Sequence, residues 1–344
     1  MNILKPLNRS WLPSVLLNIF LIALFWLPYV LGYSEMKQSE ISVFGMTSSV
    51  ILNGVVSLLI QFILIILLLF GVSRLLFVRY INIITYLPFT LMMLFAVCWQ
   101  ATHTFGNHTI ATVFVILALV EIVRIDVMKD NTSLIFNMFV SLIVASVFQI
   151  DFLFFIPFFI LGMFILDGFK CRSVLVMLFV LLVGAVTIGG YAYVFDCSEE
   201  IKNYYLQVLG FGIQLYSWEF VMNNIVFFVM ALFAVISLFF YFQNQGNLRF
   251  KTKKTVAFWT ILWLFTTAYI FLFGMEHSGF ELLYVIQTTF FMLLTFVDYR
   301  SDSKSVIFNI MLSLLFLSYM CRMVMSLVDV RTYMNSLQTA LSGI

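Results

Sequence analysis

The sequence predicts an all-α fold: a polytopic transmembrane bundle of about eleven helices, with the N-terminus inside the cell and the C-terminus outside. Hydrophobic residues make up 63% of the chain and charged residues only 10%, whereas a soluble domain has roughly 45–50% and about 25%. Apolar segments long enough to cross a membrane recur along the whole chain, and basic residues recur in every second gap between them. Because much of a folded protein's surface stays exposed, we expect the bilayer to be the solvent of this chain.

The candidate spans follow from length and hydrophobicity. A helix needs about 20 mostly apolar residues to cross a bilayer, with roughly 17–25 tolerated. On that rule the spans are 11–32, 48–72, 80–101, 108–123, 133–150, 152–169, 174–195, 219–243, 255–274, 280–297 and 305–327. The run 133–169 would be about 55 Å long as one helix, so we expect it to turn between Asp151 and Pro157.

The orientation follows from the basic residues. The segment 249–254, Arg-Phe-Lys-Thr-Lys-Lys, is the densest basic stretch, and such loops stay on the cytoplasmic side of a membrane. Counting spans from it places these cations inside: Lys5, Arg9, Arg74, Arg79, Arg124, Lys129, Lys170, Arg172, Arg249, Lys251, Lys253, Lys254, Arg300 and Lys304. Only Lys37, Lys202 and Arg331 fall outside. This alternation between gaps rich and poor in basic residues predicts that the N-terminus is inside and the C-terminus outside.

We expect a single integral membrane domain over residues 1–344, with 1–172 and 173–344 as possible halves. Prolines in three aliphatic-Pro-aromatic triplets, Pro28, Pro88 and Pro157, are predicted to kink their helices.

The segment 197–218 is predicted to form an external interfacial helix and loop. Ser198 can cap the helix, and Glu199 and Glu200 suit the positive end of its dipole. The apolar face expected of such a helix consists of Ile201, Tyr205, Val208 and Leu209. The helix is either a hinge that covers the bundle or a lid over an external site.

Most carboxylates and all three histidines fall on the predicted outer side. These residues are Glu35, Glu40, His103, His108, Asp151, Asp196, Glu199, Glu200, Glu219, Glu276, His277 and Glu281. Either a reaction centre opens away from the cytoplasm, or outer loops simply collect anions because cations are kept inside.

Arg322 is the charged residue placed deepest in a predicted span. Such a charge usually faces a partner or a water-filled cavity, and its candidate partners are Asp151, Glu219 and Glu281. It either ties helices together as a buried ion pair or binds an anionic headgroup, since a guanidinium matches phosphate oxygens with paired hydrogen bonds.

No metal, cofactor or nucleic-acid site is predicted. The spacing of His103, His108, Glu276 and His277 fits no standard ligand motif, and the chain has no C-x-x-C pair and a net charge of only +2. Amides within spans, Asn18, Gln61, Asn223 and Gln287 among them, commonly join helices by hydrogen bonds.

Several segments resemble a family of uncharacterised polytopic inner-membrane proteins of bacteria. They are Asn8–Pro13 leading to Phe25–Pro28, Phe136-Asn137 before the Asp151 turn, and Lys170–Arg172 entering the span that contains Gly184. The resemblance covers most of the chain and implies a bacterial inner-membrane protein, without implying an activity.

Glu35 and Glu40, in the first predicted outer loop, give a more distant resemblance. They are similar in position to an acidic residue of multi-span transferases that take sugars from polyprenyl-phosphate carriers. This resemblance implies that Glu35 or Glu40 is a catalytic base or a metal ligand.

Three functions are compatible with these features. The first is the handling of a lipid-linked saccharide or another anionic envelope substrate at the outer face of the bilayer. Glu35 or Glu40 then acts as the base, and the binding residues are Arg322, Asp151, Glu219, Glu281 and His103. The second is a transporter or flippase with a polar cavity at mid-membrane depth. The third is a structural subunit of an envelope complex, whose protein partners the sequence does not specify.

Overall fold

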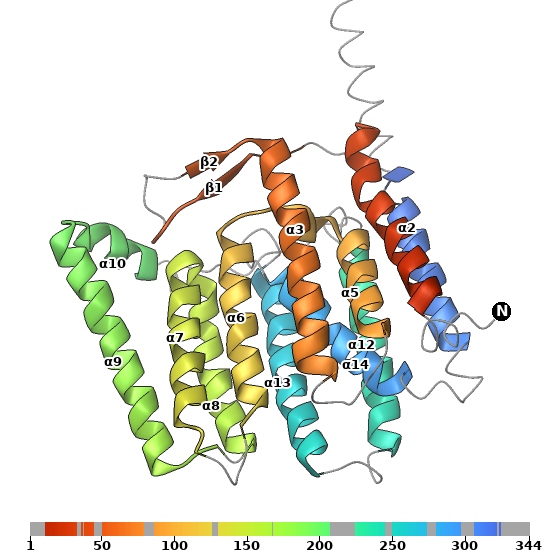
Figure 1. Ribbon diagram of the computed structural model, residues 1–344. Coiled ribbons are helices and arrows are strands. Elements are labelled where there is room, and N and C mark those ends of the chain that lie inside the picture. The colour runs from red at the N-terminus through yellow and green to blue at the C-terminus, as the bar shows by residue number, and fades with distance from the viewer. Residues whose placement is uncertain are drawn as a thin grey trace, which may run out of the picture.

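The computed structural model is a bundle of apolar helices that stand side by side, with most of the short connecting elements gathered at one end (Figure 1). It describes residues 11–32, 36, 38–44, 50–78, 86–125, 130–166, 168–206, 224–244, 250–273, 280–296, 306–321 and 323–324. The helical class predicted from the composition is confirmed.

The elements follow one another as short-range sequence signals dictate. The helices are α2 (Trp11–Val30), α3 (Gly54–Val72), α5 (Leu87–Cys98), α6 (Asn107–Val123), α7 (Thr132–Phe148), α8 (Phe155–Ile165), α9 (Cys171–Val194), α10 (Ser198–Leu206), α12 (Ile225–Asn244), α13 (Phe250–Phe273), α14 (Glu281–Phe296) and a last helix, Val306–Cys321. The connecting elements are strands β1 (Ser39–Ile41) and β2 (Val50–Leu52), a π-helix η1 (Ser73–Val78), and 3-10 helices η2 (Gln100–His103) and η3 (Ile150–Phe154).

Five of the described helices, α2, α3, α9, α12 and α13, are long and apolar enough to cross a membrane. The other described apolar helices have 10–17 residues, so at 1.5 Å per residue all of them are shorter than the roughly 30 Å hydrocarbon core of a bilayer. A membrane protein is therefore indicated, while the count of eleven crossings stays a prediction.

Three local expectations are wrong. Residues 50–52 form a strand that pairs antiparallel with β1, Glu40 opposite Ile51, so the second span starts later than predicted. The basic segment 249–254 is not a loop throughout, because α13 begins at Phe250. Pro88 and Pro157 lie in the first turns of α5 and α8, where a missing N–H costs nothing; only Pro28 lies well inside a helix.

The predicted helix after Ser198 is confirmed as α10, and it covers the end of the bundle. Ile201 and Tyr204 are its buried residues, and the Tyr204 hydroxyl donates to the carbonyl of Ser146 at 3.0 Å. Tyr204 thus takes the place predicted for Tyr205, which is half-buried. Val208 and Leu209 lie outside the described residues.

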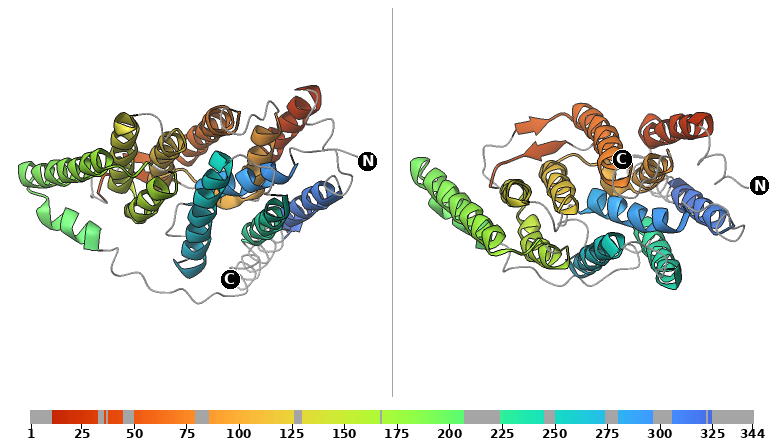
Figure 2. Two further views of the ribbon diagram at one scale, coloured as in Figure 1. Left: turned by 90° about the horizontal axis from the view of Figure 1, so that it is seen from below. Right: turned by 60° about the horizontal axis from the view of Figure 1, so that its bottom comes forward.

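Helix α14 occupies the centre of the bundle. It packs against α5, α6, α12 and α13, and the two views of Figure 2 show it inside the ring of the other helices. All of its 16 residues except Leu294 are buried. In contrast, only 17% of the most apolar stretch of α9 is buried inside the bundle, so most of the surface of α9 is exposed on the outside of the bundle.

The two ends of the bundle differ in charge among the described residues. At one end, the lower end in Figure 1, lie Arg74, Arg124, Lys170, Arg172, Lys253 and Lys254, with Glu121 and Asp130 as carboxylates. The other end, with β1, η2, η3, α10 and the start of α14, carries Glu40, Asp151, Asp196, Glu199, Glu200 and Glu281, with Lys202 as its cation. We call these the basic end and the acidic end.

Gly162 tests how tightly the helices pack. A Cβ at Gly162 would lie 2.6 Å from Ile122 Cδ1 and 2.6 Å from Phe258 Cε2, and both neighbours are buried. We expect Gly162→Ala to lower the free energy of unfolding by about 1–3 kcal/mol through overpacking. Gly189→Ala on exposed α9 is the control, since a Cβ there meets nothing within 4 Å. Thermal unfolding in detergent measures both, and equal effects would contradict the packing.

Candidate functional site

Asp151 is a buried carboxylate on η3 whose two oxygens are bound by side chains. It is 1% exposed. The Tyr269 hydroxyl of α13 donates to Oδ1 at 3.0 Å, and the Gln149 amide donates to Oδ2 at 2.5 Å. Because burying a carboxylate without partners is costly, these two donors are what hold Asp151 between η3 and α13.

Glu281 is the second buried carboxyl group of the acidic end. It is the first residue of α14 and is 5% exposed, and no ion pair found among the described residues involves it. The preceding ring, Phe280, contacts Phe152, which follows Asp151, at a centroid distance of 4.9 Å. The segments that carry the two carboxyl groups are therefore neighbours.

A polar stripe continues from Glu281 along α14. Tyr284 and Thr288 follow at positions i+3 and i+7, which lie on the same face of a helix. Beside them, the Gln287 side-chain oxygen accepts a hydrogen bond from the Thr266 hydroxyl of α13 at 2.5 Å. A buried central helix thus carries polar groups over two turns.

For several buried polar atoms in and around this stripe, no hydrogen-bond partner is found among the described residues. They are Trp99 Nε1, Trp263 Nε1, Tyr284 Oη, Gln287 Nε2 and Thr288 Oγ1. A buried group left unsatisfied costs about 1–3 kcal/mol. Five such groups would cost about 5–15 kcal/mol, which equals the whole stability of a typical domain. Surrounding the polar stripe of α14 with apolar groups alone would therefore cost too much folding stability.

His103 is fixed in a structural position. Its Nε2 lies 3.1 Å from the carbonyl oxygen of Ala96, so Nε2 carries the hydrogen. Nδ1 lies 3.2 Å from the Tyr29 hydroxyl oxygen. Thr102 Oγ1 adds a bond to the same carbonyl at 2.7 Å, so His103 and Thr102 together close the C-terminal end of α5.

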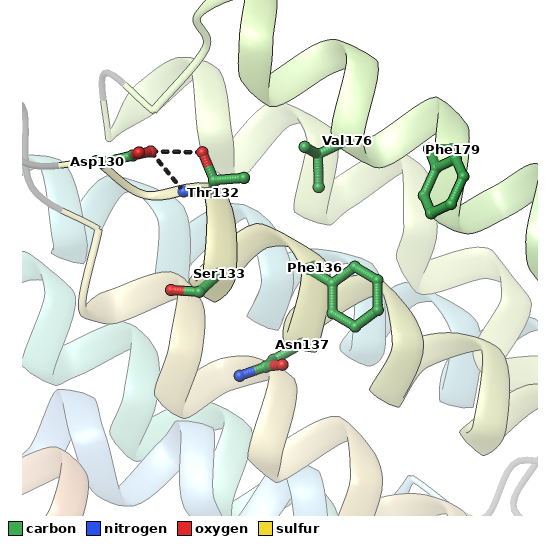
Figure 3. A pocket seen from close by; sticks show the side chains of 7 residues that line it. All are labelled: Asp130, Thr132, Ser133, Phe136, Asn137, Val176 and Phe179. Carbon is green, nitrogen blue, oxygen red and sulfur yellow. Dashed lines mark hydrogen bonds between the residues drawn. The ribbon is translucent and has the colours of Figure 1, made fainter.

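A groove of about 560 Å³ lies at the basic end between α7 and α9 (Figure 3). Its lining residues are Asp130, Thr132, Ser133, Phe136, Asn137, Val176 and Phe179. One Asp130 oxygen accepts from the Thr132 hydroxyl and backbone N–H, and the other pairs with Arg172 at 2.9 Å. Both oxygens of Asp130 therefore take part in interactions at the edge of the groove, where the side chains of Asp130 and Arg172 are largely exposed.

The remaining predicted site residues do not join these clusters in the described part of the chain. Glu40 is exposed on β1. Glu35, Glu219 and Arg322 lie outside the described residues, so the pairing of Arg322 with Asp151 or Glu281 stays a prediction. No group of three or more His, Cys, Asp or Glu side chains that could hold a metal is found among the described residues.

The sequence reasoning missed the tyrosines and tryptophans of the site. Tyr269 is 118 positions from Asp151, and Trp263 is buried in the same helix. Both looked like ordinary residues of an apolar span. Only Gln149, two positions before Asp151, could have been found from the sequence as a neighbouring donor.

A comparison of the chain with known protein families, with curated proteins and with solved structures finds no match. The function is therefore argued from the site alone.

The ion pair in the groove gives a pH-dependent prediction. Hydrogen bonds from the Thr132 side chain and backbone, with the charge of Arg172, hold the pKa of Asp130 below its ordinary value. Ionised Asp130 therefore stabilises the fold at neutral pH, and this contribution disappears as the pH falls through the pKa of the folded state. We expect Asp130→Asn to lower the melting temperature at neutral pH and the difference from wild type to shrink in acid.

Glu40→Gln on β1 is the matched control, since Glu40 is exposed and takes part in none of the ion pairs described above. Its melting temperature should follow that of the wild type throughout. An Asp130→Asn difference that is constant or grows in acid would contradict the assignment.

Proposed function

We propose that the protein is a polytopic membrane transporter that couples the binding of a proton to the movement of a small polar solute. Asp151 and Glu281 are the proton-binding groups, and the polar stripe of α14 forms the route. The observation that carries this proposal is the burial of two carboxyl groups at neighbouring places inside one end of the bundle.

Burial favours a transporter over an enzyme of the outer face. Ionisable residues inside a membrane bundle are expensive, and they commonly mark proton or substrate pathways. A carboxyl group that attacks or deprotonates a lipid-linked substrate must reach it, whereas Asp151 and Glu281 are 1% and 5% exposed. A carrier covers its site between openings, which is the arrangement expected here.

The proposed location is the bacterial inner membrane, with about eleven crossings and the basic end in the cytoplasm. The gathering of described cations at one end supports this orientation, because positive loops are retained inside. The N-terminus is then inside, the C-terminus is outside, and the acidic end with Asp151 and Glu281 opens outward.

The transfer of a sugar from a polyprenyl-phosphate carrier stays a prediction that rests on resemblance. Of its two proposed bases, Glu35 lies outside the described residues and Glu40 is an exposed residue of β1. We find no feature of the described residues that favours sugar transfer over transport.

Deuterium exchange of carboxyl protons tests the proposal. In lipid-reconstituted protein transferred to deuterium oxide, we expect the infrared band of protonated carboxyl groups to shift within the lifetime of the folded state, because a transport site must open. Glu281→Gln is expected to remove most of this band, and Asp151→Asn is expected to alter it. Glu199→Gln, an exposed carboxylate of the same end, is the control and should leave the band unchanged.

The same variants are then tested for transport. Currents across supported membranes are recorded for a panel of small amines, acids and sugars, and Glu281→Gln should abolish any solute-induced current that Glu199→Gln retains. A carboxyl band that never exchanges in folded protein would show a static structural group and overturn the proposal.

A further inference from the structure

The centre of the bundle contains a group of polar atoms that point to a ligand. Trp263 Nε1, Tyr284 Oη and Thr288 Oγ1 are buried, and no partner in hydrogen-bonding geometry is found for them among the described residues. The side chains of Thr267, Trp263 and Thr288 lie close to the Tyr284 hydroxyl. These polar atoms therefore gather at one place in the core.

Aromatic rings form the wall of this place. Trp263 stacks on Tyr284 at a centroid distance of 6.2 Å, and Phe227 of α12 lies 4.9 Å from the same ring. Trp99, at the end of α5, approaches it edge-on at 5.9 Å and brings a further unpartnered indole N–H. Residues from α5, α12, α13 and α14 thus enclose the site.

The hydrogen-bonding chemistry of these groups indicates which kind of ligand fits the site. An indole N–H can only donate a hydrogen bond, and the Tyr and Thr hydroxyls can each donate one. The four side chains carry no charge, and Glu281 lies one helical turn from Tyr284 on the same face. The site is therefore suited to uncharged oxygen atoms that accept hydrogen bonds.

We propose that Trp99, Trp263, Tyr284 and Thr288 form a buried binding site for neutral acceptor oxygens, supplied either by ordered water or by a hydroxyl- or carbonyl-bearing solute. The site deepens the proposed function by naming the solute class and rests on that function for its role in transport. Its existence depends only on the contacts given above.

Stability measurements distinguish an occupied site from a dry one. If the hydroxyls bind acceptors, Tyr284→Phe and Thr288→Val each remove a hydrogen bond, and the melting temperature should fall by about 2–4 °C per bond. If the site is dry, each change removes an unsatisfied group, and the melting temperature should stay constant or rise. Tyr193→Phe on α9, where the residue is 88% exposed, is the matched control and should have no effect.

Resonance Raman spectra give a second readout that does not depend on folding. The difference between wild type and Trp263→Phe should show an indole N–H that is hydrogen-bonded. A free indole, or a melting temperature that does not fall in both hydroxyl variants, would overturn the inference.

Native mass spectrometry separates the two sources of oxygen. If the wild type carries an additional bound mass that is reduced in Tyr284→Phe, the oxygen belongs to a solute. If the wild type and the variant both appear as the bare chain, the oxygen belongs to water. If the variants are destabilised but the carboxyl protons never exchange, the site stands and the transport proposal fails. If the carboxyl protons exchange but the variants are not destabilised, only the binding site fails.

Discussion

The complete burial of α14 is the constraint on which the rest of the structure depends. A helix surrounded by other helices cannot leave its polar side chains to water or to lipid headgroups, so each must find a partner inside the bundle. Gln287 finds Thr266, and Thr295 donates to the carbonyl of Ser237 at 3.3 Å. Glu281, Tyr284 and Thr288 extend this polar content toward the acidic end.

The central position of α14 also explains the uneven lengths of the helices. Helices with a large exposed apolar surface, such as α3 and α9, run to 19 and 24 residues. The central α5 and α14 have 12 and 16 residues, and η2, η3 and α10 form a layer over the acidic end of the bundle.

That layer is where the chemistry of the protein gathers. Thr102 and His103 close α5, while Gln149 and Tyr269 hold Asp151. The Gln61 amide of α3 adds a bond to the Thr102 carbonyl at 2.6 Å. The hydrogen bonds of His103 join it to the end of α5 and to Tyr29, whereas Asp151 is joined to α13 through Tyr269.

The sequence was sufficient to predict most helices, because their apolar runs are bounded by charged or capping residues. The ranges 108–123 and 280–297 match α6 and α14 within one residue at each end. It could not predict β1 and β2, whose three-residue strands are too short for an alternating pattern. Hydropathy also could not tell which helix is central, since exposure to lipid and burial in protein select the same residues.

The candidate site was predicted only in part for the same reason. Asp151, Glu281 and His103 lie on segments at one end of the bundle, and their role as binding residues stays a prediction. Their partners Tyr269 and Tyr29 come from distant helices, and no local spacing indicates such a contact. After Glu281, Gln287 was the residue of α14 that the sequence singled out as polar. Tyr284 and Thr288 were not, because tyrosine and threonine are common in apolar spans.

Carbene photolabelling from the lipid phase tests the central position of α14 most directly. A lipid-soluble reagent activated in reconstituted wild-type protein should modify α9 along its length and leave 281–296 unmodified, as read by peptide mass spectrometry. Modification of α14 at every third or fourth residue would show a face exposed to lipid, and that result would contradict the account.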